Sequence, residues 1–113
     1  MGSYPAKLHR IIDPDLLELS VSLGFGQSCL LRVKLTGFDP PPDYRDRLLD
    51  VILRWLEAND IPDADFPLSL WSDAETWVLP AVYSGEVFGK RVPGSSLNLA
   101  LYERCRQAGI PGF

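Results

Sequence analysis

Few residues in this chain have a type and spacing that could do chemistry. His9 is the only histidine, and no serine or cysteine partner pattern accompanies it. Cys29 and Cys105 form no metal-binding spacing, so we expect buried free thiols and a cytoplasmic setting. Residues 84–94 are rich in glycine but lack the spacing of a phosphate-binding loop, and they are predicted to be an exposed connector. The sequence thus offers no nucleophilic triad, zinc cluster or phosphate-binding loop.

The remaining candidates are carboxylates and a cation near predicted bends. Asp13 and Asp15 flank a proline, and Asp39 precedes three consecutive prolines. These aspartates are either turn formers that satisfy backbone donors or members of a site. Lys34, on the polar face of a predicted strand, is either a solvated charge or a phosphate ligand. Three tryptophans either pack in the core or offer a surface on which bases stack: Trp55, Trp71 and Trp77.

Alternation of apolar and polar side chains predicts the strands that position these residues. A first strand is expected over residues 6–12. Residues 17–23 and 31–36 then alternate with a period of two, and the glycines between them predict a hairpin. The prolines at 40–42 forbid any continuation of the ladder. The aspartates therefore fall at the ends of the predicted strands.

The second half of the chain predicts two helices and two more strands. An amphipathic helix over residues 44–56 should be capped by Asp43. Strands follow over 66–71 and 77–83, and we place Pro80 at an edge or bulge. The last helix begins after a cap at Ser95 or Ser96 and ends before Gly109. The predicted order is three strands, a helix, two strands and a helix, which is the order of a five-stranded OB-fold barrel. The expected fold class is therefore α+β, mainly β with two packed helices.

Length and charge limit the function classes. The 113 residues suit one domain, 1–113, and 46% hydrophobic content can fill a core. The chain has no apolar run that could span a bilayer, and its first ten residues hold no secretory signal, so no membrane association is expected. The formal charge of −4 does not favour non-specific binding to nucleic acid. We expect a monomer.

Residues 12–16 read IDPDL, and residues 34–42 read KLTGFDPPP. These two segments resemble motifs of the thermonuclease family, the micrococcal-nuclease-like OB-folds. The first is similar to a family bend that reads Val/Ile-Asp-Gly-Asp-Thr, and the second to the family strand Arg-x-x-Gly-Ile-Asp-x-Pro-Glu. The segments WVLPAVYSG and SLNLALYERC are similar to the last barrel strand and the helix that follows it, which typically begins Leu-Asn-Glu-x-Leu. The resemblance covers nearly the whole chain.

The resemblance implies calcium-dependent phosphodiester hydrolysis with a site that is only partly present. Asp15 and Asp39 match the metal carboxylates, and the backbone carbonyl of Pro40 matches a further ligand. Lys34 stands in place of an arginine that stabilises charge on the phosphate. Pro42 stands in place of the glutamate that activates or positions water, and proline can neither take a proton nor hold a water molecule.

The second family arginine can be aligned in two ways. If residues 77–83 are the last barrel strand, Trp77 occupies the arginine's place, and this is the alignment we prefer. The other sets residues 88–91, FGKR, against the family's Tyr-Gly-Arg and makes Lys90 or Arg91 the cation. It leaves no strand before the last helix.

The resemblance therefore implies a degenerate domain that binds a partner, protein or nucleic acid, without efficient nuclease activity. The rival interpretation is a weak, divalent-metal-dependent nuclease that uses Asp15, Asp39 and Lys34 on DNA or RNA. Trp77, Lys90 and Arg91, with Lys34, are the candidate partner-binding residues, and any calcium site should be weak. The compact form is the kind that phage genomes carry, which favours a phage origin and the host cytoplasm.

Overall fold

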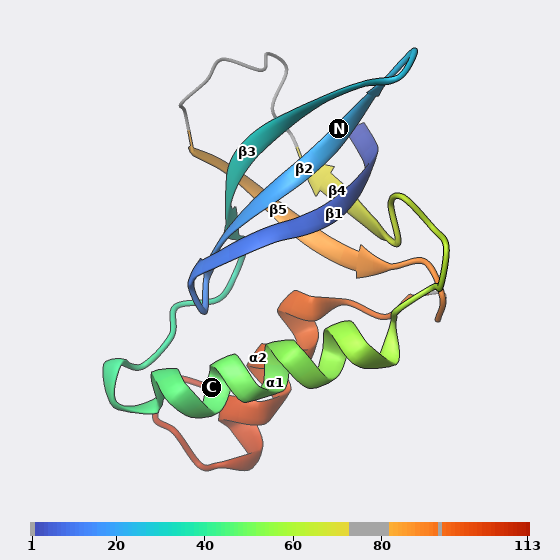
Figure 1. The fold of residues 1–113 in the computed structure, drawn as a ribbon. Coiled ribbons are helices and arrows are strands. Elements are labelled where there is room, and N and C mark those ends of the chain that lie inside the picture. The colour runs from blue at the N-terminus through green and yellow to red at the C-terminus, as the bar shows by residue number, and fades with distance from the viewer. Residues whose placement is uncertain (1, 73–81, 93) are drawn as a thin grey trace.

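Five strands close into a barrel, and two helices lie together beneath it (Figure 1). The computed structural model describes residues 2–72, 82–92 and 94–113. The elements in chain order are β1 (Gly2–Asp13), β2 (Leu16–Gly24), β3 (Gln27–Leu35), the 3-10 turn η1 (Pro42–Tyr44), α1 (Arg45–Ala58), β4 (Leu68–Ser72), β5 (Val82–Gly89) and α2 (Leu97–Gln107). This order confirms the α+β class predicted from the sequence.

The strands run around the barrel in the order β1-β2-β3-β5-β4, and β4 pairs with β1 to close it. All pairs are antiparallel except β3 with β5, which is parallel. This closed arrangement is consistent with an OB-fold-like barrel. Within the described residues, neither helix is long and apolar enough to cross a membrane.

The core follows the predicted alternation on β2 and β3. Leu17, Leu19 and Val21 on β2 are buried, as are Leu31, Val33 and Leu35 on β3. Leu48, Ile52 and Trp55 of α1 close one side of this core, with Leu97, Leu101 and Cys105 of α2 beside them. Both cysteines are free; Cys105 is buried, but Cys29 is only half-buried. Burial raises the pKa of both thiols above the ordinary value, which keeps them protonated at neutral pH.

The prediction of a loop over residues 84–94 is wrong, because β5 occupies Val82–Gly89. The expected strand over 77–83 overlaps β5 only at its end, and residues 77–81 lie outside the described residues. Gly85 and Gly89 misled the prediction. They occupy inward positions where a Cβ would lie 2.8 Å from the Leu70 side chain or 2.0 Å from the Asn59 amide. These glycines permit close packing inside a strand, not a turn.

Smaller differences concern the element ends. β1 starts earlier than expected and pairs with both β2 and β4, while β4 begins two residues later than predicted. Asp43 lies inside η1 and does not cap α1; Tyr44 is the N-cap residue and makes no side-chain cap bond. Ser96 caps α2 as expected, and its hydroxyl accepts the Leu99 N–H at 3.2 Å.

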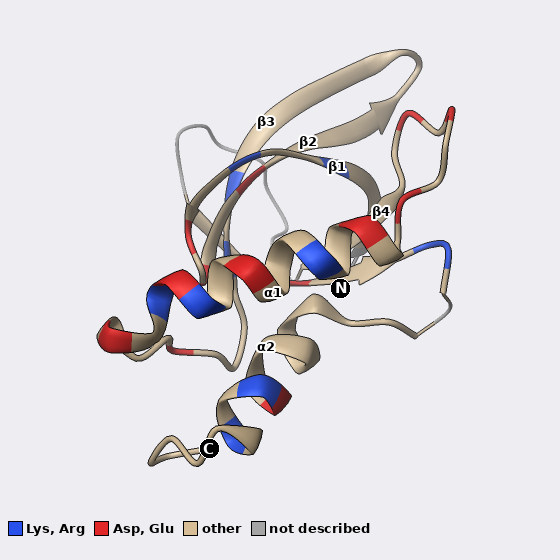
Figure 2. Ribbon diagram, turned by 60° about the horizontal axis from the view of Figure 1, so that its bottom comes forward, with Lys and Arg blue, Asp and Glu red and all other residues tan. Residues whose placement is uncertain are grey.

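The tip of the β2–β3 hairpin carries a fully exposed phenylalanine. Phe25 and Gly26 have φ angles of 53° and 74°, the pattern of a type I′ turn. No charged residue occurs between Glu18 and Arg32, so the whole end of the hairpin is uncharged (Figure 2). Phe25 therefore adopts a left-handed backbone conformation, which is unfavourable for a side chain other than glycine, and its ring is not buried in this chain.

Replacing Phe25 with asparagine should raise the free energy of unfolding by about 0.5–1 kcal/mol, because asparagine tolerates the left-handed region and no packing is lost. Urea denaturation of both proteins would measure the change. Phe25→Ala is the control, since it removes the ring without easing the backbone. A loss of stability in Phe25→Asn would contradict this account of the turn.

Candidate functional site

Three of the predicted site residues meet at one end of the barrel. Lys34 projects from the outer face of β3, and its Nζ lies 3.5 Å from Oδ2 of Asp15 and 3.3 Å from Oδ1 of Asp39. Asp15 sits in the turn between β1 and β2, which is tied to β3 because the Leu35 N–H donates to the Asp15 carbonyl at 2.8 Å. Asp39 follows the bend at Gly37, whose φ is 76°. Local backbone geometry thus brings both aspartates to the lysine.

The electrostatics of this cluster favour a charged lysine. The hydrogen bond to Asp39 and the charge of Asp15 raise the pKa of Lys34 above the ordinary lysine value. The ammonium is therefore fully protonated at neutral pH. The Asp15 side chain is mostly covered, whereas the Asp39 side chain is 93% exposed and, within the described residues, forms its ion pair with Lys34.

These residues fit a calcium ion poorly. Calcium takes about six to eight oxygen ligands, and the cluster offers two carboxylates with an ammonium between them. Within the described part of the chain, no three His, Cys, Asp or Glu side chains come together in a group that could hold a metal. The adjoining open hollow has a volume of about 280 Å³ and is lined by residues that include Thr36, Phe38 and Ser84. That is below the usual size of a small-molecule pocket.

Pro40 and Pro42 add no acidic group to the cluster. Pro40 follows Asp39 directly, outside regular secondary structure, and Pro42 is the first residue of η1. Asp13, the other aspartate of the first turn, pairs with Arg45, whose Nε donates to Asp13 Oδ1 at 3.2 Å and whose NH2 donates to the Ile12 carbonyl at 3.2 Å. Asp13 therefore connects β1 to the start of α1.

Lys90 and Arg91 are not brought to this cluster. Lys34 lies beside Ser84 near the start of β5, whereas Lys90 and Arg91 follow its end. At about 3.3 Å per strand residue, that separation is roughly 20 Å. Arg91 donates to the Asp60 carbonyl at 2.9 Å, beside the end of α1. Trp77 lies outside the described residues.

This placement bears on the two alignments of the family arginine. Because Lys90 and Arg91 come after the last barrel strand, they do not occupy a loop before it. β5 begins five residues later than the strand expected over 77–83 and is followed by α2. The arginine's place then falls before Val82, among residues that the structure does not describe.

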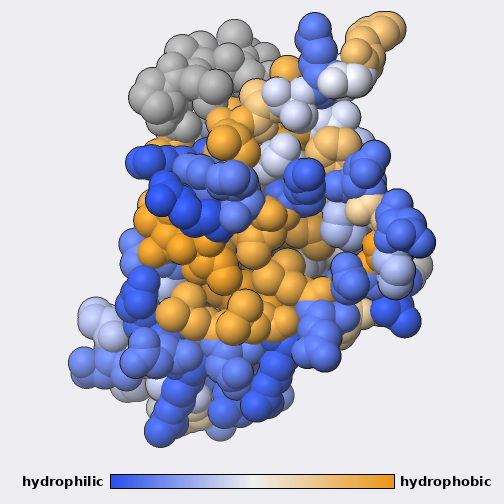
Figure 3. Space-filling model, in the orientation of Figure 1, coloured by the Kyte–Doolittle hydropathy of each residue, from blue (hydrophilic) through white to orange (hydrophobic). Residues whose placement is uncertain are grey.

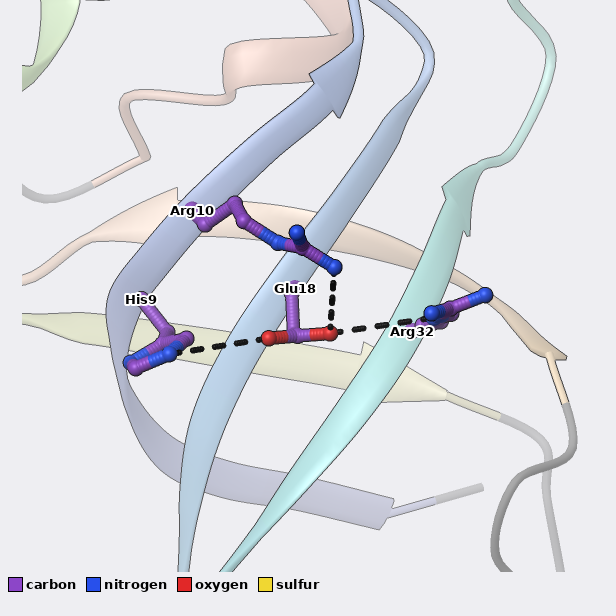
Figure 4. Close-up of polar contacts among 4 residues, drawn as sticks. All are labelled: His9, Arg10, Glu18 and Arg32. Atoms are coloured by element: carbon purple, nitrogen blue, oxygen red, sulfur yellow. Dashed lines mark hydrogen bonds and ion pairs between the residues drawn. The ribbon is translucent and has the colours of Figure 1, made fainter.

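A second charged cluster lies on the outer face of β1, β2 and β3, and sequence reasoning missed it. Glu18 stands at its centre, surrounded by His9 (3.6 Å), Arg10 (3.4 Å) and Arg32 (3.7 Å) (Figure 4). The Glu18 side chain is only 13% exposed, while the three basic side chains are each about half exposed. The cluster therefore presents its cations and hides its carboxylate.

Part of this second cluster could be found from the hairpin. Residues 18 and 32 face each other on β2 and β3, as the alternation and the short turn already imply. The pairing of Arg10 with Glu18 depends on a β-bulge between Leu8 and Arg10, and no sequence signal marks that irregularity.

No protein-family model and no curated protein matches this chain. The thermonuclease resemblance therefore stays a prediction that rests on the quoted motifs. The structure itself establishes a closed five-stranded barrel with two helices, a lysine that bridges two aspartates at one end, and a glutamate that holds three basic side chains on the outer face.

Proposed function

We propose that the chain is a degenerate thermonuclease-like OB-fold domain that binds a partner protein and does not cleave nucleic acid efficiently. The observation that carries the proposal is the position of the Lys34 ammonium, within 3.5 Å of both Asp15 and Asp39. A cation supplied by the chain thus lies between the two carboxylates that the family resemblance assigns to metal binding and offsets part of their charge.

The chemistry that remains around Lys34 is too sparse for hydrolysis. Pro42 has no group that could take a proton from water, and the nearest aspartate in sequence, Asp43, lies within η1. Lysine also lacks the planar two-point geometry with which arginine holds a phosphate. Catalytic groups that act as a unit lose most of their effect when one is missing.

The charge balance of the outer face favours a protein partner over nucleic acid. Arg10, Arg32 and Lys34 lie on this face, and Glu18, Asp15 and Asp39 pair with them. A phosphate-binding surface needs cations that are free to neutralise phosphates. Lys34 lies between two carboxylates, Arg10 and Arg32 share Glu18, and the chain as a whole carries −4.

A nuclease assay tests the proposal directly. We expect no cleavage of single- or double-stranded DNA or RNA with calcium, magnesium or manganese, and no mobility shift of the same nucleic acids at low salt. Cleavage that disappears in Asp39→Ala would instead establish the weak nuclease. A shift without cleavage would assign a nucleic acid as the partner and overturn the choice of a protein.

Calcium affinity gives a second, independent readout. We expect binding in the millimolar range, because only two carboxylates are available and a lysine competes for both. Lys34→Ala should tighten binding a few-fold, because it removes the ammonium that competes for both carboxylates, and exposed ion pairs are weak. Calorimetry would measure both proteins, with Lys90→Ala as the control. Micromolar binding by the unmodified chain, abolished in Asp15→Asn, would contradict the competition by lysine.

A further inference from the structure

A continuous apolar area lies on one face of the molecule, over β1 and α1, with hydrophilic side chains above and below it (Figure 3). The apolar side chains that reach the surface from these two elements define what we call the β1–α1 patch: Leu8 and Ile11 of β1, and Leu49, Leu53 and Leu56 of α1. Leu53 is the most exposed, at 58%. An apolar area of this kind with a polar border is typical of an interaction site.

Contacts at both ends show that β1 and α1 run beside each other. At one end, Arg45 of α1 bonds to Asp13 and to the Ile12 carbonyl of β1. At the other end, Leu8 and Leu56 line the same hollow. The middle of the patch therefore lies between two elements that are held together at their ends.

The border on the β side of the patch is basic. His9 and Arg10 of β1 and Arg32 of β3 surround Glu18, which is nearly covered (Figure 4). The three bases are about half exposed, so they determine the charge that a partner would meet. Glu18 holds these side chains in place and leaves a net positive border.

The border on the α1 side is acidic. Residues four and three positions apart share one stripe of a helix, so Asp46, Asp50, Leu53 and Glu57 form a stripe next to that of Leu49 and Leu56. Arg47 and Arg54 lie beyond this stripe, whereas Arg45 is turned towards β1; Arg54 reaches back to Asp50 at 3.1 Å. The patch is thus flanked by bases on one side and by acids on the other.

We propose that the β1–α1 patch is the interface of a homodimer with two-fold symmetry. A two-fold axis that runs along the patch, between its two borders, sets the basic border of each protomer against the acidic border of the other. The surface is therefore complementary to a second copy of itself. Five partly exposed side chains supply only part of the about 800 Å² that each partner contributes to a standard interface. Both borders must therefore be buried with them. This requires a partner that presents an acidic border to the basic one and a basic border to the acidic one, as a second copy of the chain does.

Sedimentation equilibrium over a concentration series tests the proposal. The expected mass rises with concentration from the 12.6 kDa of one chain towards twice that value. Leu53→Asp should weaken association at least about tenfold, because it replaces the most exposed leucine of the patch by a charge. The matched control is Leu99→Asp on α2, where the leucine is 55% exposed, and it should leave association unchanged.

Charge reversal distinguishes this symmetric interface from a general apolar attraction. Asp46→Lys with Glu57→Lys should be monomeric, because both borders are then basic. A second variant, Arg10→Glu with Arg32→Glu and Glu18→Lys, inverts the other border but keeps its internal ion pairs. Mixing the two variants should restore a heterodimer, since each border again meets its opposite.

Three outcomes would overturn the proposal. The first is a monomer at every concentration of the unmodified chain. The second is unchanged association in Leu53→Asp, and the third is association of the Asp46→Lys, Glu57→Lys variant with itself as strongly as the unmodified chain. Circular dichroism would confirm that each variant is folded. None of these readouts depends on nuclease activity, so the dimer and the proposed function can fail separately.

Discussion

Replacing Trp55 with alanine should lower the free energy of unfolding by about 3–5 kcal/mol, the usual cost of removing a large aromatic side chain from a core. Trp55 is 8% exposed and belongs to the cluster that α1 packs against the barrel. Its Nε1 donates to the Ser95 hydroxyl oxygen at 3.0 Å, which links α1 to the segment just before α2. Urea denaturation of dilute protein would measure the loss.

Two further variants separate the contributions of Trp55. Trp55→Phe keeps most of the packing and removes only the indole donor, so it should cost about 1 kcal/mol plus a small packing loss. Leu99→Ala, an exposed position on α2, should change stability by no more than about 0.5 kcal/mol. If Trp55→Ala costs less than about 1 kcal/mol, α1 does not cover the barrel in the way that its buried face indicates.

Strands with one buried face could be predicted from the sequence because a period of two leaves a clear signal. On β2 and β3 the apolar positions are filled by leucine and valine, and all of those from Leu17 to Val21 and from Leu31 to Leu35 are buried. On β5 the inward positions are Tyr83, Gly85, Val87 and Gly89. Two of the four are glycines, so the alternation is invisible to a pattern based on apolar side chains.

The reason for glycine on β5 is packing between distant segments. The inward side of Gly85 meets Leu70 of β4, and that of Gly89 meets Asn59 at the end of α1. Neither contact can be inferred from the local sequence, because it depends on how tightly α1 and β4 approach β5. A glycine considered alone predicts a turn, but Gly85 and Gly89 lie within a strand because the packing around them leaves no room for a side chain.

The candidate site was predictable where it depends on local geometry. Asp15 and Lys34 meet because a short turn and a hairpin register set their positions, with Leu16 opposite Lys34. The contact of the Lys34 ammonium with both carboxylates could not be predicted, since it depends on side-chain positions across a bend. The basic border formed around Glu18 was missed because it needs a third strand, β1, and a bulge within it.

The role of Asn98 also became visible only in the structure, although the segment that resembles the family helix contains it. Its Oδ1 accepts the Val87 N–H at 3.1 Å, and its Nδ2 donates to the carbonyls of Thr36 and Gly85 at 3.0 and 3.1 Å. Asn98 is buried, so one side chain at the start of α2 ties the helix to β5 and to the residue after β3. The bonds to Val87 and Gly85 are buried, where little water can replace them, and the bond to Thr36 is partly buried.

Asn98→Ala should therefore lower the free energy of unfolding by about 1–4 kcal/mol, because it leaves the buried Val87 N–H without a partner, at about 1–3 kcal/mol, and removes one bond of about 1 kcal/mol from the partly buried Thr36 carbonyl. The Gly85 carbonyl is less affected, since it also accepts the Thr36 N–H at 2.8 Å. Chemical denaturation near neutral pH would measure the loss. A cost below about 1 kcal/mol would show that the three bonds are replaced elsewhere.

Asn98→Asp gives a sharper test through its pH dependence. The aspartate can still accept the Val87 N–H, but its other oxygen faces two carbonyl oxygens that the amide had satisfied. This environment disfavours the charged form, so the pKa of the new carboxyl should be higher in the folded state than in the unfolded state. The folded protein then binds the extra proton more readily, and the stability of Asn98→Asp relative to Asn98→Ala should rise as the pH falls through the folded-state pKa. A pH-independent difference between the two variants would mean that the carboxyl reaches water and that Asn98 does not hold the barrel to α2 through buried bonds.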